Sequence, residues 1–196
     1  MTSGRAVICP EFGTPEVLRL AHREPPRPGD GQVRIRVHAA AANFPDVLLI
    51  AGKYQITVPP PFVPGSEFAG TVEELGPGCH GIAVGDRVTG TGLYGAFADE
   101  IVVPATHLAT IPDSVDDLTA AAFGVAYRTA YHSLRSVARV ERGEKVIVLG
   151  AGGGVGLAAV QLGVALGAEV IAVASSAAKL ASARSYGAAH LIDHRA

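Results

Sequence analysis

The fold of this chain is decided by one stretch, Glu144-Lys145-Val146-Ile147-Val148-Leu149-Gly150-Ala151-Gly152-Gly153-Gly154-Val155-Gly156. Its first part, Val146 to Leu149, is a run of aliphatic residues, which is typical of a parallel strand buried on both faces. Glycines follow at once, and without a Cβ they let backbone N–H groups at a helix N-terminus come close to a phosphate. The stretch therefore predicts a strand, a phosphate-binding turn and the start of a helix.

The sequence after the glycines continues the same unit. Small residues follow along the expected helix, Gly167-Ala168 ends it, and Glu169 to Ala174 predicts a second strand. The strict G-x-G-x-x-G spacing is not met, because the best register, 151-153-156, has alanine in its first place. The succession of strand, turn, helix and strand nevertheless predicts a dinucleotide-binding unit. Its pyrophosphate would lie on a turn made of Ala151, Gly152, Gly153, Gly154, Val155 and Gly156.

The residues after the second strand indicate which dinucleotide binds. NAD enzymes usually carry Asp or Glu there for the ribose 2′-OH, whereas this chain has Ser175 and Ser176, followed by Lys179. Hydroxyls and an ammonium group favour a 2′-phosphate, which a carboxylate would repel. We therefore expect NADPH as the cofactor. The alternative makes Ser175 or Ser176 a helix N-cap and Lys179 a solvated charge, and both interpretations can hold together.

The composition excludes several classes of function. The 196 residues carry a net charge of −2, so neither nucleic acid nor an anionic membrane is an expected partner. Cys9 and Cys79 are the only cysteines and form no C-x-x-C, which fits a reducing cytoplasm. Residues 146–168 carry no charge, but the seven glycines among them argue against a transmembrane helix.

The pattern of the chain changes near Asp117, which predicts two domains. Residues 1–117 consist of short strand-like runs separated by Pro- and Gly-rich turns, which predicts a compact barrel-like β domain. Residues 118–196 begin with Ala-rich helical sequence and run into the dinucleotide-binding unit. The expected strands of the first domain are residues 5–9, 33–39, 68–75, 85–88 and 96–103, with a short helix at 45–50.

The order of these parts resembles that of a known family. Motifs spread along nearly the whole chain carry the resemblance, among them Ala41-Ala42-Asn43-Phe44-Pro45-Asp46, Pro64-Gly65-Ser66-Glu67-Phe68-Ala69-Gly70, Val84-Gly85-Asp86-Arg87-Val88 and Arg128-Thr129-Ala130-Tyr131. The chain is similar to the medium-chain dehydrogenase/reductase superfamily, and within it to the zinc-free quinone oxidoreductase (zeta-crystallin-like) branch. The resemblance implies an α/β fold, with an N-terminal GroES-like β-barrel domain followed by a parallel, doubly wound Rossmann domain.

The zinc positions of the superfamily separate its branches. In the zinc alcohol dehydrogenases a cysteine and a histidine of the first domain bind the catalytic metal, and the resemblance places Asn43 and Ser66 at those positions. Neither is a good zinc ligand, the four-cysteine lobe is missing, and the seven histidines show no metal-ligand spacing. The resemblance therefore implies a zinc-independent enzyme that transfers hydride from NADPH to a quinone or an α,β-unsaturated carbonyl.

The resemblance also assigns roles to single residues. Tyr54 would be the hydroxyl near the substrate, and Asn43 would orient the nicotinamide or the substrate by its amide. Thr129 would lie near the nicotinamide ribose, and His194 would stand beside the adenosine phosphate in place of the usual tyrosine. Three of these residues have a structural alternative: loop packing for Tyr54, a turn cap before Pro45 for Asn43, and helix packing for Thr129.

The Rossmann part looks incomplete. A doubly wound dinucleotide fold has about six strands, whereas this sequence predicts three, at residues 146–149, 169–174 and 190–192. The resemblance implies that the nicotinamide-binding half and the strands that form the family's homodimer are missing, which leaves open whether the truncated chain is active alone. The alternatives are a non-catalytic module that binds nucleotide or pairs with another chain, and an enoyl-reductase segment of a larger synthase.

Overall fold

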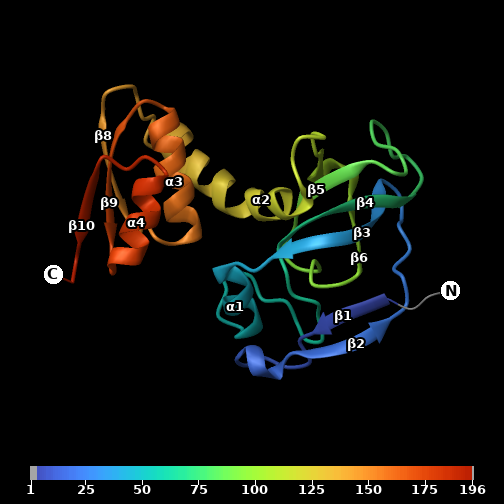
Figure 1. Cartoon of the computed structure of the whole chain (residues 1–196). Helices are drawn as coiled ribbons and strands as arrows, with labels where there is room; N and C mark the ends of the chain where they lie inside the picture. Colours follow the sequence, from blue (N-terminus) through green and yellow to red (C-terminus); the bar gives the residue numbers. More distant parts are fainter. Residues whose placement is uncertain (1–3, 196) are drawn as a thin grey trace. The chain divides into compact units, whose positions relative to one another are not determined.

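The computed structural model describes residues 4–195, which form two compact units (Figure 1). The units divide between Gly124 and Val125, inside helix α2 (Asp117–Tyr131). Asp117, where the sequence pattern changes, is the first residue of the helix that runs across this division. The domain limits 1–117 and 118–196 stay a prediction.

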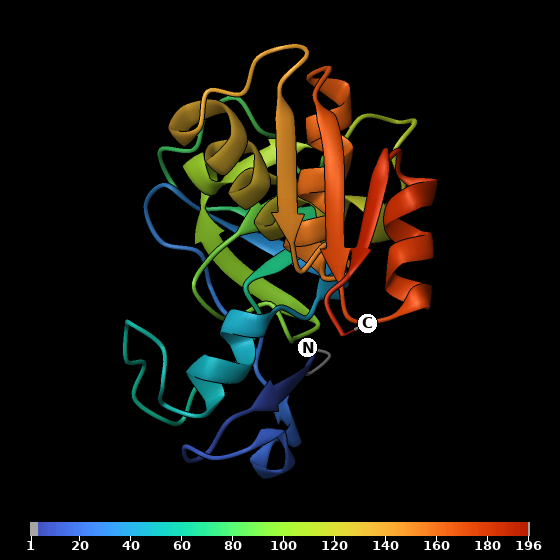
Figure 2. The same ribbon diagram turned by 90° about the vertical axis from the view of Figure 1, so that its left-hand side faces the viewer.

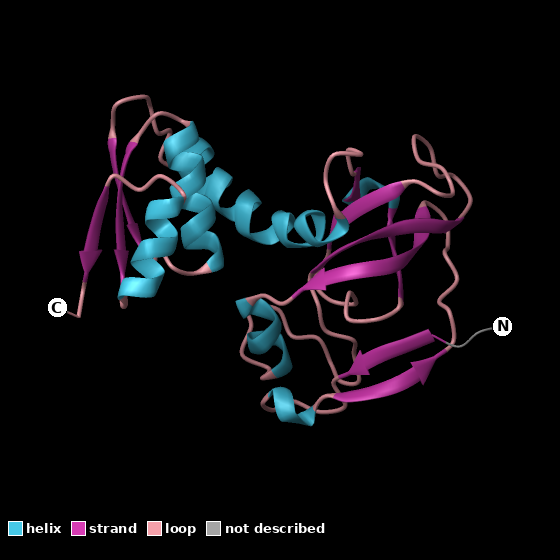
Figure 3. Ribbon diagram, in the orientation of Figure 1, coloured by secondary structure: helices cyan, strands magenta, loops and turns pink. Residues whose placement is uncertain are grey.

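The first unit is built on an antiparallel sheet with the strand order β6-β3-β4-β5-β7 (Figure 3). Its strands are β3 (Gln32–Ala41), β4 (Glu67–Leu75), β5 (Arg87–Thr91), β6 (Glu100–Pro104) and β7 (Leu108–Thr110). The alternation expected for residues 33–39 is confirmed, because Val33 and Ile35 are both fully buried. They share one hydrophobic core with Phe68, Val72, Val88, Ala96, Ile101 and Val103.

Smaller elements flank this sheet in the first unit. They are the antiparallel pair β1 (Gly4–Ile8) and β2 (Arg19–Arg23), the helix α1 (Phe44–Ile50), and the short helical turns η1 (Pro15–Val17) and η2 (Ala105–His107). The sequence predicts β1 and α1 to within one residue. It does not predict β2, because only Ala21 of that strand is even partly buried and the strand is defined by its pairing with β1.

The second unit is a parallel sheet with two connecting helices. Strands β8 (Lys145–Leu149), β9 (Glu169–Ala174) and β10 (His190–Asp193) pair in the order β10-β9-β8, and Figure 2 shows them side by side in orange to red. Helix α3 (Gly154–Ala165) connects β8 to β9, and α4 (Ala177–Ser185) connects β9 to β10. The core is made of small and β-branched residues: Val148, Ala151, Val160, Val170, Ala172, Ala183 and Ala188. All three strands predicted here are confirmed.

The Ala-rich helical sequence at the start of residues 118–196 forms two consecutive helical segments. Helix α2 stops at Tyr131 and the chain continues as the π-helical segment η3 (His132–Val137). Arg139 then takes a φ of 55°, which is outside the helical region and turns the chain toward β8. The end of this helix carries no glycine or proline, so the sequence offers no signal for it.

One face of the second sheet remains open within residues 4–195. Val148 points into the core with α3 and is 7% exposed, whereas its neighbours Ile147 and Leu149 point to the opposite face and are 61% and 77% exposed. Parallel sheets are usually covered on both faces. The described residues therefore cover only one face of β8.

A methyl group at position 156 tests how closely α3 approaches the turn that precedes it. An added Cβ at Gly156 would lie 2.2 Å from the carbonyl oxygen of Gly150, so Gly156→Ala should lower the free energy of unfolding by about 1–3 kcal/mol. Gly154→Ala is the matched control, because the nearest atom to its added Cβ is 4.0 Å away. The control should be neutral or stabilise by up to about 1 kcal/mol. Equal midpoints of urea unfolding for the two variants would contradict the close approach.

Candidate functional site

The predicted pyrophosphate turn lies between β8 and α3 in the second unit. Gly150 has a φ of 72°, and its carbonyl accepts the N–H of Gly153 at 3.0 Å. The N–H of Ala151 donates to the carbonyl of Val173 on β9 at 3.0 Å, which ties the turn to the sheet. Since α3 begins at Gly154, the N–H groups of its first turn have no partner within the helix and are available to an anion.

The turn also provides room for a ligand. A cavity of about 500 Å³ is lined by Gly150, Gly153, Gly154, Val155 and Gly156, together with residues of β8 and η3. Ala151, which takes the first glycine place of the motif, is fully buried and packs in the core of the unit. Alanine is therefore accommodated at 151, where the side chain points away from the cavity, but not at 156. Backbone donors of a glycine-rich turn beside a cavity fit the pyrophosphate of a dinucleotide.

The residues predicted to select the dinucleotide come together at the same place. Ser176 is the N-cap of α4, and its Oγ accepts the N–H of Lys179 at 3.4 Å. The Lys179 ammonium donates to Ser175 Oγ at 3.3 Å. The stem of Lys179 also covers Gly152, where an added Cβ would lie 2.5 Å from Lys179 Cβ. Ser176 thus has the N-cap role of the structural alternative, and Lys179 also lies beside the glycine turn.

The two remaining residues predicted for the cofactor site differ in their surroundings. The Thr129 hydroxyl donates to the carbonyl of Val125 at 2.7 Å, one turn earlier in its own helix, so it makes the helix contact of the structural alternative. His194 follows β10 and is exposed, and its N–H donates to the carbonyl of Ala174 at 3.2 Å. His194 therefore lies beside the end of β9, where Ser175 follows.

Asn43 of the first unit lies at the centre of a polar cluster. It is the N-cap of α1 and forms a capping box with Asp46, whose Oδ2 accepts the Asn43 N–H at 2.7 Å. Its Nδ2 donates to Glu67 Oε1 at 2.8 Å and lies 3.4 Å from both Ser66 Oγ and the Ala41 carbonyl. Asn43 and Ser66, the two residues at the superfamily's zinc positions, are therefore neighbours, and Asn43 also has its cap role.

The carboxyl groups of this cluster are buried. Asp46 is 3% exposed and Glu67 is 1% exposed. Burial raises the pKa of Asp46, and the hydrogen bond from the Asn43 N–H opposes that rise, as do Ser66 and the Gly65 N–H nearby. The second oxygen of Asp46, Oδ1, accepts no hydrogen bond from Ser66, Gly65 or any other residue that the structure describes. The Asp46 carboxyl is therefore only partly satisfied by the protein.

Sequence reasoning missed both of these carboxyl residues. Asp46 and Glu67 stand within the motifs that carry the family resemblance, but an acidic residue next to a turn usually indicates a solvated position. A signal was available in the apolar neighbours: Leu49 and Ile50 follow Asp46 on α1, and Phe68 follows Glu67 on β4. These neighbours carry the two carboxyl groups into the interior.

The structure does not bring Tyr54 into this cluster. Tyr54 is half-buried and packs against the apolar cluster of Cys9, Leu49, Ile50, Val58 and Phe62. Its hydroxyl makes no hydrogen bond with any residue in the described part of the chain, so the packing interpretation accounts for the contacts it has.

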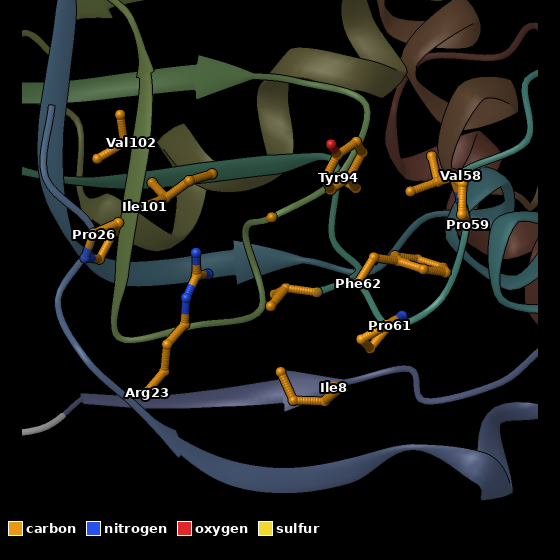
Figure 4. Close-up of a pocket in the computed structure, with 12 residues that line it drawn as sticks. Ile8, Arg23, Pro26, Val58, Pro59, Pro61, Phe62, Tyr94, Ile101 and Val102 are labelled. Carbon is orange, nitrogen blue, oxygen red and sulfur yellow. The ribbon is translucent and has the colours of Figure 1, made fainter. Parts of the chain in front are cut away.

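A second cavity, of about 550 Å³, is lined in part by Val58 and Phe62, which belong to the cluster that Tyr54 packs against (Figure 4). Tyr94 and Phe62 meet edge to face in its wall, with ring centroids 6.1 Å apart, and Arg23 reaches in from β2. Neither Asn43 nor Tyr54 lines it.

Residues 4–195 contain no group of three or more His, Cys, Asp or Glu side chains arranged to hold a metal ion. None of their helices is both long enough and apolar enough to cross a membrane.

The burial of Asp46 has a consequence for stability. Its folded-state pKa lies above the ordinary value of 3.8, so the unfolded chain releases this proton at a lower pH than the folded chain does. Ionisation of Asp46 therefore lowers the free energy of unfolding as the pH rises through this range. Asp46→Asn keeps an acceptor for the Asn43 N–H, so it should gain stability relative to wild type between about pH 3 and about pH 7.

Urea unfolding of both proteins at the two pH values measures this difference. Asp113→Asn is the control, because it makes the same chemical change at an exposed position on the loop before α2. A relative stability of Asp46→Asn that falls as the pH rises would contradict the burial of this carboxyl.

Two family models match the chain. The model described as "Alcohol dehydrogenase GroES-like domain" matches residues 29–113, which include the cluster around Asn43. The model described as "Zinc-binding dehydrogenase" matches residues 154–196, which run from the start of α3 to the end of the chain and include Lys179.

Similar proteins cover nearly the whole of this chain. The "Quinone oxidoreductase-like protein 2 homolog" of Nematostella vectensis is 41% identical over 194 residues, which are 98% of this chain and 53% of that protein. A mycobacterial structure complexed with NADPH has a TM-score of 0.91 and 39% identity, over 97% of this chain and 58% of that one. The CurK enoyl reductase structure has a TM-score of 0.91 and 28% identity, over 100% of this chain and 61% of that one.

The chain thus spans between 53% and 61% of the length of these three proteins. The GroES-like model matches before the dehydrogenase model along the chain, which is the domain order that the sequence predicts. The high TM-scores show that the described residues have the same fold as the corresponding parts of the two solved structures. The chain belongs to the medium-chain dehydrogenase/reductase superfamily, as a quinone oxidoreductase-like member with a GroES-like domain followed by part of a Rossmann domain.

Proposed function

We propose that this chain provides the cofactor-binding and substrate-orienting residues of a zinc-independent, NADPH-dependent oxidoreductase that reduces a quinone or an α,β-unsaturated carbonyl. The observation that carries the proposal is the meeting of Lys179 with Gly152 and Ser175 beside the glycine turn. An ammonium group at this place suits the 2′-phosphate that distinguishes NADPH from NADH. A relative named as quinone oxidoreductase-like, a structure complexed with NADPH and an enoyl reductase support the same chemistry.

The second unit supplies the cofactor site in this proposal. NADPH, when bound, supplies the hydride. The N–H groups of Gly154, Val155 and Gly156 at the start of α3 bind the pyrophosphate, because they have no partner within the helix. Ser175, Ser176 and Lys179 bind the 2′-phosphate, His194 lies beside the adenosine phosphate, and Thr129 contacts the nicotinamide ribose.

The first unit supplies the substrate residues. Tyr54 donates a hydrogen bond or a proton to the substrate oxygen that gains negative charge after hydride transfer. Asn43 orients the ligand by its amide. We place the substrate domain at residues 1–117 and the cofactor domain at 118–196, and we assign the protein to the cytoplasm, with a small molecule rather than nucleic acid as its partner. The homodimer expected from the resemblance stays a prediction.

A second candidate function is a non-catalytic module that binds NADPH without turning it over. The exposure of Ile147 and Leu149 on the open face of β8 favours this candidate. Apolar side chains exposed on a parallel sheet usually pack against a further structural element. The two functions are separated by the absorbance of NADPH in the presence of benzoquinone. Consumption of NADPH with formation of an equal amount of hydroquinone supports the enzyme, whereas binding without consumption supports the module.

The choice of cofactor is tested at Lys179. Lys179→Ala removes the cation beside Ser175 and should weaken the binding of NADPH by about tenfold to a hundredfold, as expected for a charged hydrogen bond. The affinity for NADH should remain unchanged. Arg184→Ala is the matched control, because it removes an exposed cation from the last turn of the same helix. Equal weakening of NADPH and NADH by Lys179→Ala would remove the assignment.

The proton donor is tested at Tyr54. Tyr54→Phe should lower kcat for quinone or enone reduction by about a hundredfold, the usual contribution of a general acid. The dissociation constant of NADPH should not change. Tyr94→Phe is the control, since it removes a hydroxyl from a cavity of the same unit that Tyr54 itself does not line. An unchanged kcat in Tyr54→Phe would leave this residue with its packing role alone.

A further inference from the structure

We infer that Glu67 is a positioning residue that lets Asn43 accept a hydrogen bond from a ligand but prevents it from donating one. The ligand group that Asn43 recognises is then an N–H or O–H donor, such as a carboxamide or a hydroxyl. This inference rests on the proposed function, because it concerns the ligand of the same site.

The donor side of the Asn43 amide is fully used within the protein. A carboxamide has two N–H hydrogens and one oxygen with two acceptor sites. Glu67 Oε1 takes one hydrogen at 2.8 Å, and Ser66 Oγ and the Ala41 carbonyl lie 3.4 Å from the same nitrogen. The orientation of the amide follows from this chemistry, since a carboxylate and a carbonyl would repel the amide oxygen in that place.

The acceptor side of the amide remains available. The N–H of Asp46 donates to the backbone carbonyl of Asn43 at 3.1 Å, so the capping box takes at most one of the two acceptor sites of Asn43 Oδ1. An N-cap side chain can also accept from the second helical residue, but that residue is Pro45, which has no N–H. Asn43 as a whole residue is half-buried, not fully enclosed.

Glu67 holds this orientation firmly because its carboxyl group has no room to turn away. It is the first residue of β4 and is 1% exposed. On its other side it meets α2, where a Cβ added at Gly124 would lie 3.0 Å from Glu67 Oε2. Breaking the contact with Asn43 would leave a buried carboxyl oxygen without that partner, which is costly.

The consequence is a rule for the ligand. The carbonyl oxygens of a quinone or an enone only accept hydrogen bonds, so Asn43 cannot bind them. Two groups of the proposed reaction can donate to it: the carboxamide N–H of the nicotinamide and the hydroxyl of a reduced substrate. Stabilisation of the substrate oxygen then falls to other groups.

The experiment has two arms, one for each source of the donor. The cofactor arm compares the dissociation constants of NADPH and its acetylpyridine analogue, in which a methyl group replaces the carboxamide NH₂. The substrate arm compares hydroquinone with its dimethyl ether. In one arm wild type should prefer the donor-bearing ligand by about two- to tenfold, the usual contribution of one hydrogen bond. Asn43→Ala should abolish that preference.

An exchange of the two partners separates positioning from a merely structural role. Asn43→Asp alone sets a second carboxylate against Glu67 and should lose the preference. Combined with Glu67→Gln, the new amide can donate to the new carboxylate, which still keeps one oxygen toward the ligand. The double variant should therefore recover the preference, and thermal unfolding shows whether each variant is folded.

The outcomes distinguish this inference from the proposed function. A preference that survives Asn43→Ala in both arms, or that a folded double variant fails to recover, overturns the inference. Wild type that binds NADPH but shows no preference in either arm overturns the inference alone. If wild type binds neither dinucleotide and neither phenol derivative, the proposed function fails and the inference fails with it.

Discussion

The second unit depends on one close contact, between the helix α3 and the carbonyl oxygen of Gly150. Gly156 comes so near that oxygen that an added Cβ would lie 2.2 Å away. This contact fixes where α3 begins relative to β8, and the residues of the first helical turn line the cavity beside the glycines. The same geometry lets Lys179 lie across Gly152, so the turn and the residues after β9 form one site.

The polar cluster of the first unit works by the opposite means. The glycine turn offers backbone donors, whereas in the cluster the amide nitrogen of Asn43 lies within hydrogen-bond distance of the Ser66 and Glu67 side chains. Because buried hydrogen bonds cost free energy to break, the side chains of the cluster keep the orientations that would position a ligand. Asp46 is the exception, since one of its oxygens meets no donor within the described residues.

Local signals account for what the sequence could predict. Strand β9 is found at the predicted residues, 169–174, because an apolar run with a glycine before it is a local signal, and Gly167 has a φ of 84° at the predicted helix end. Strand β2 was not predictable, because its residues are mostly exposed and it is defined by its pairing with β1. The burial of Asp46 and Glu67 was missed, although the apolar residues beside them gave a signal. The contact of Lys179 with Gly152 was also not predicted, although both residues were predicted to belong to the cofactor site.

The central claim is that the described residues form a working NADPH site, and a titration of the 196-residue chain tests it most directly. The fluorescence of the reduced nicotinamide, followed as protein is added to NADPH or to NADH, gives both dissociation constants. The account predicts saturable binding with NADPH bound about tenfold more tightly than NADH, since a charged hydrogen bond contributes this much. Binding of neither dinucleotide, or equal affinity for both, would contradict it.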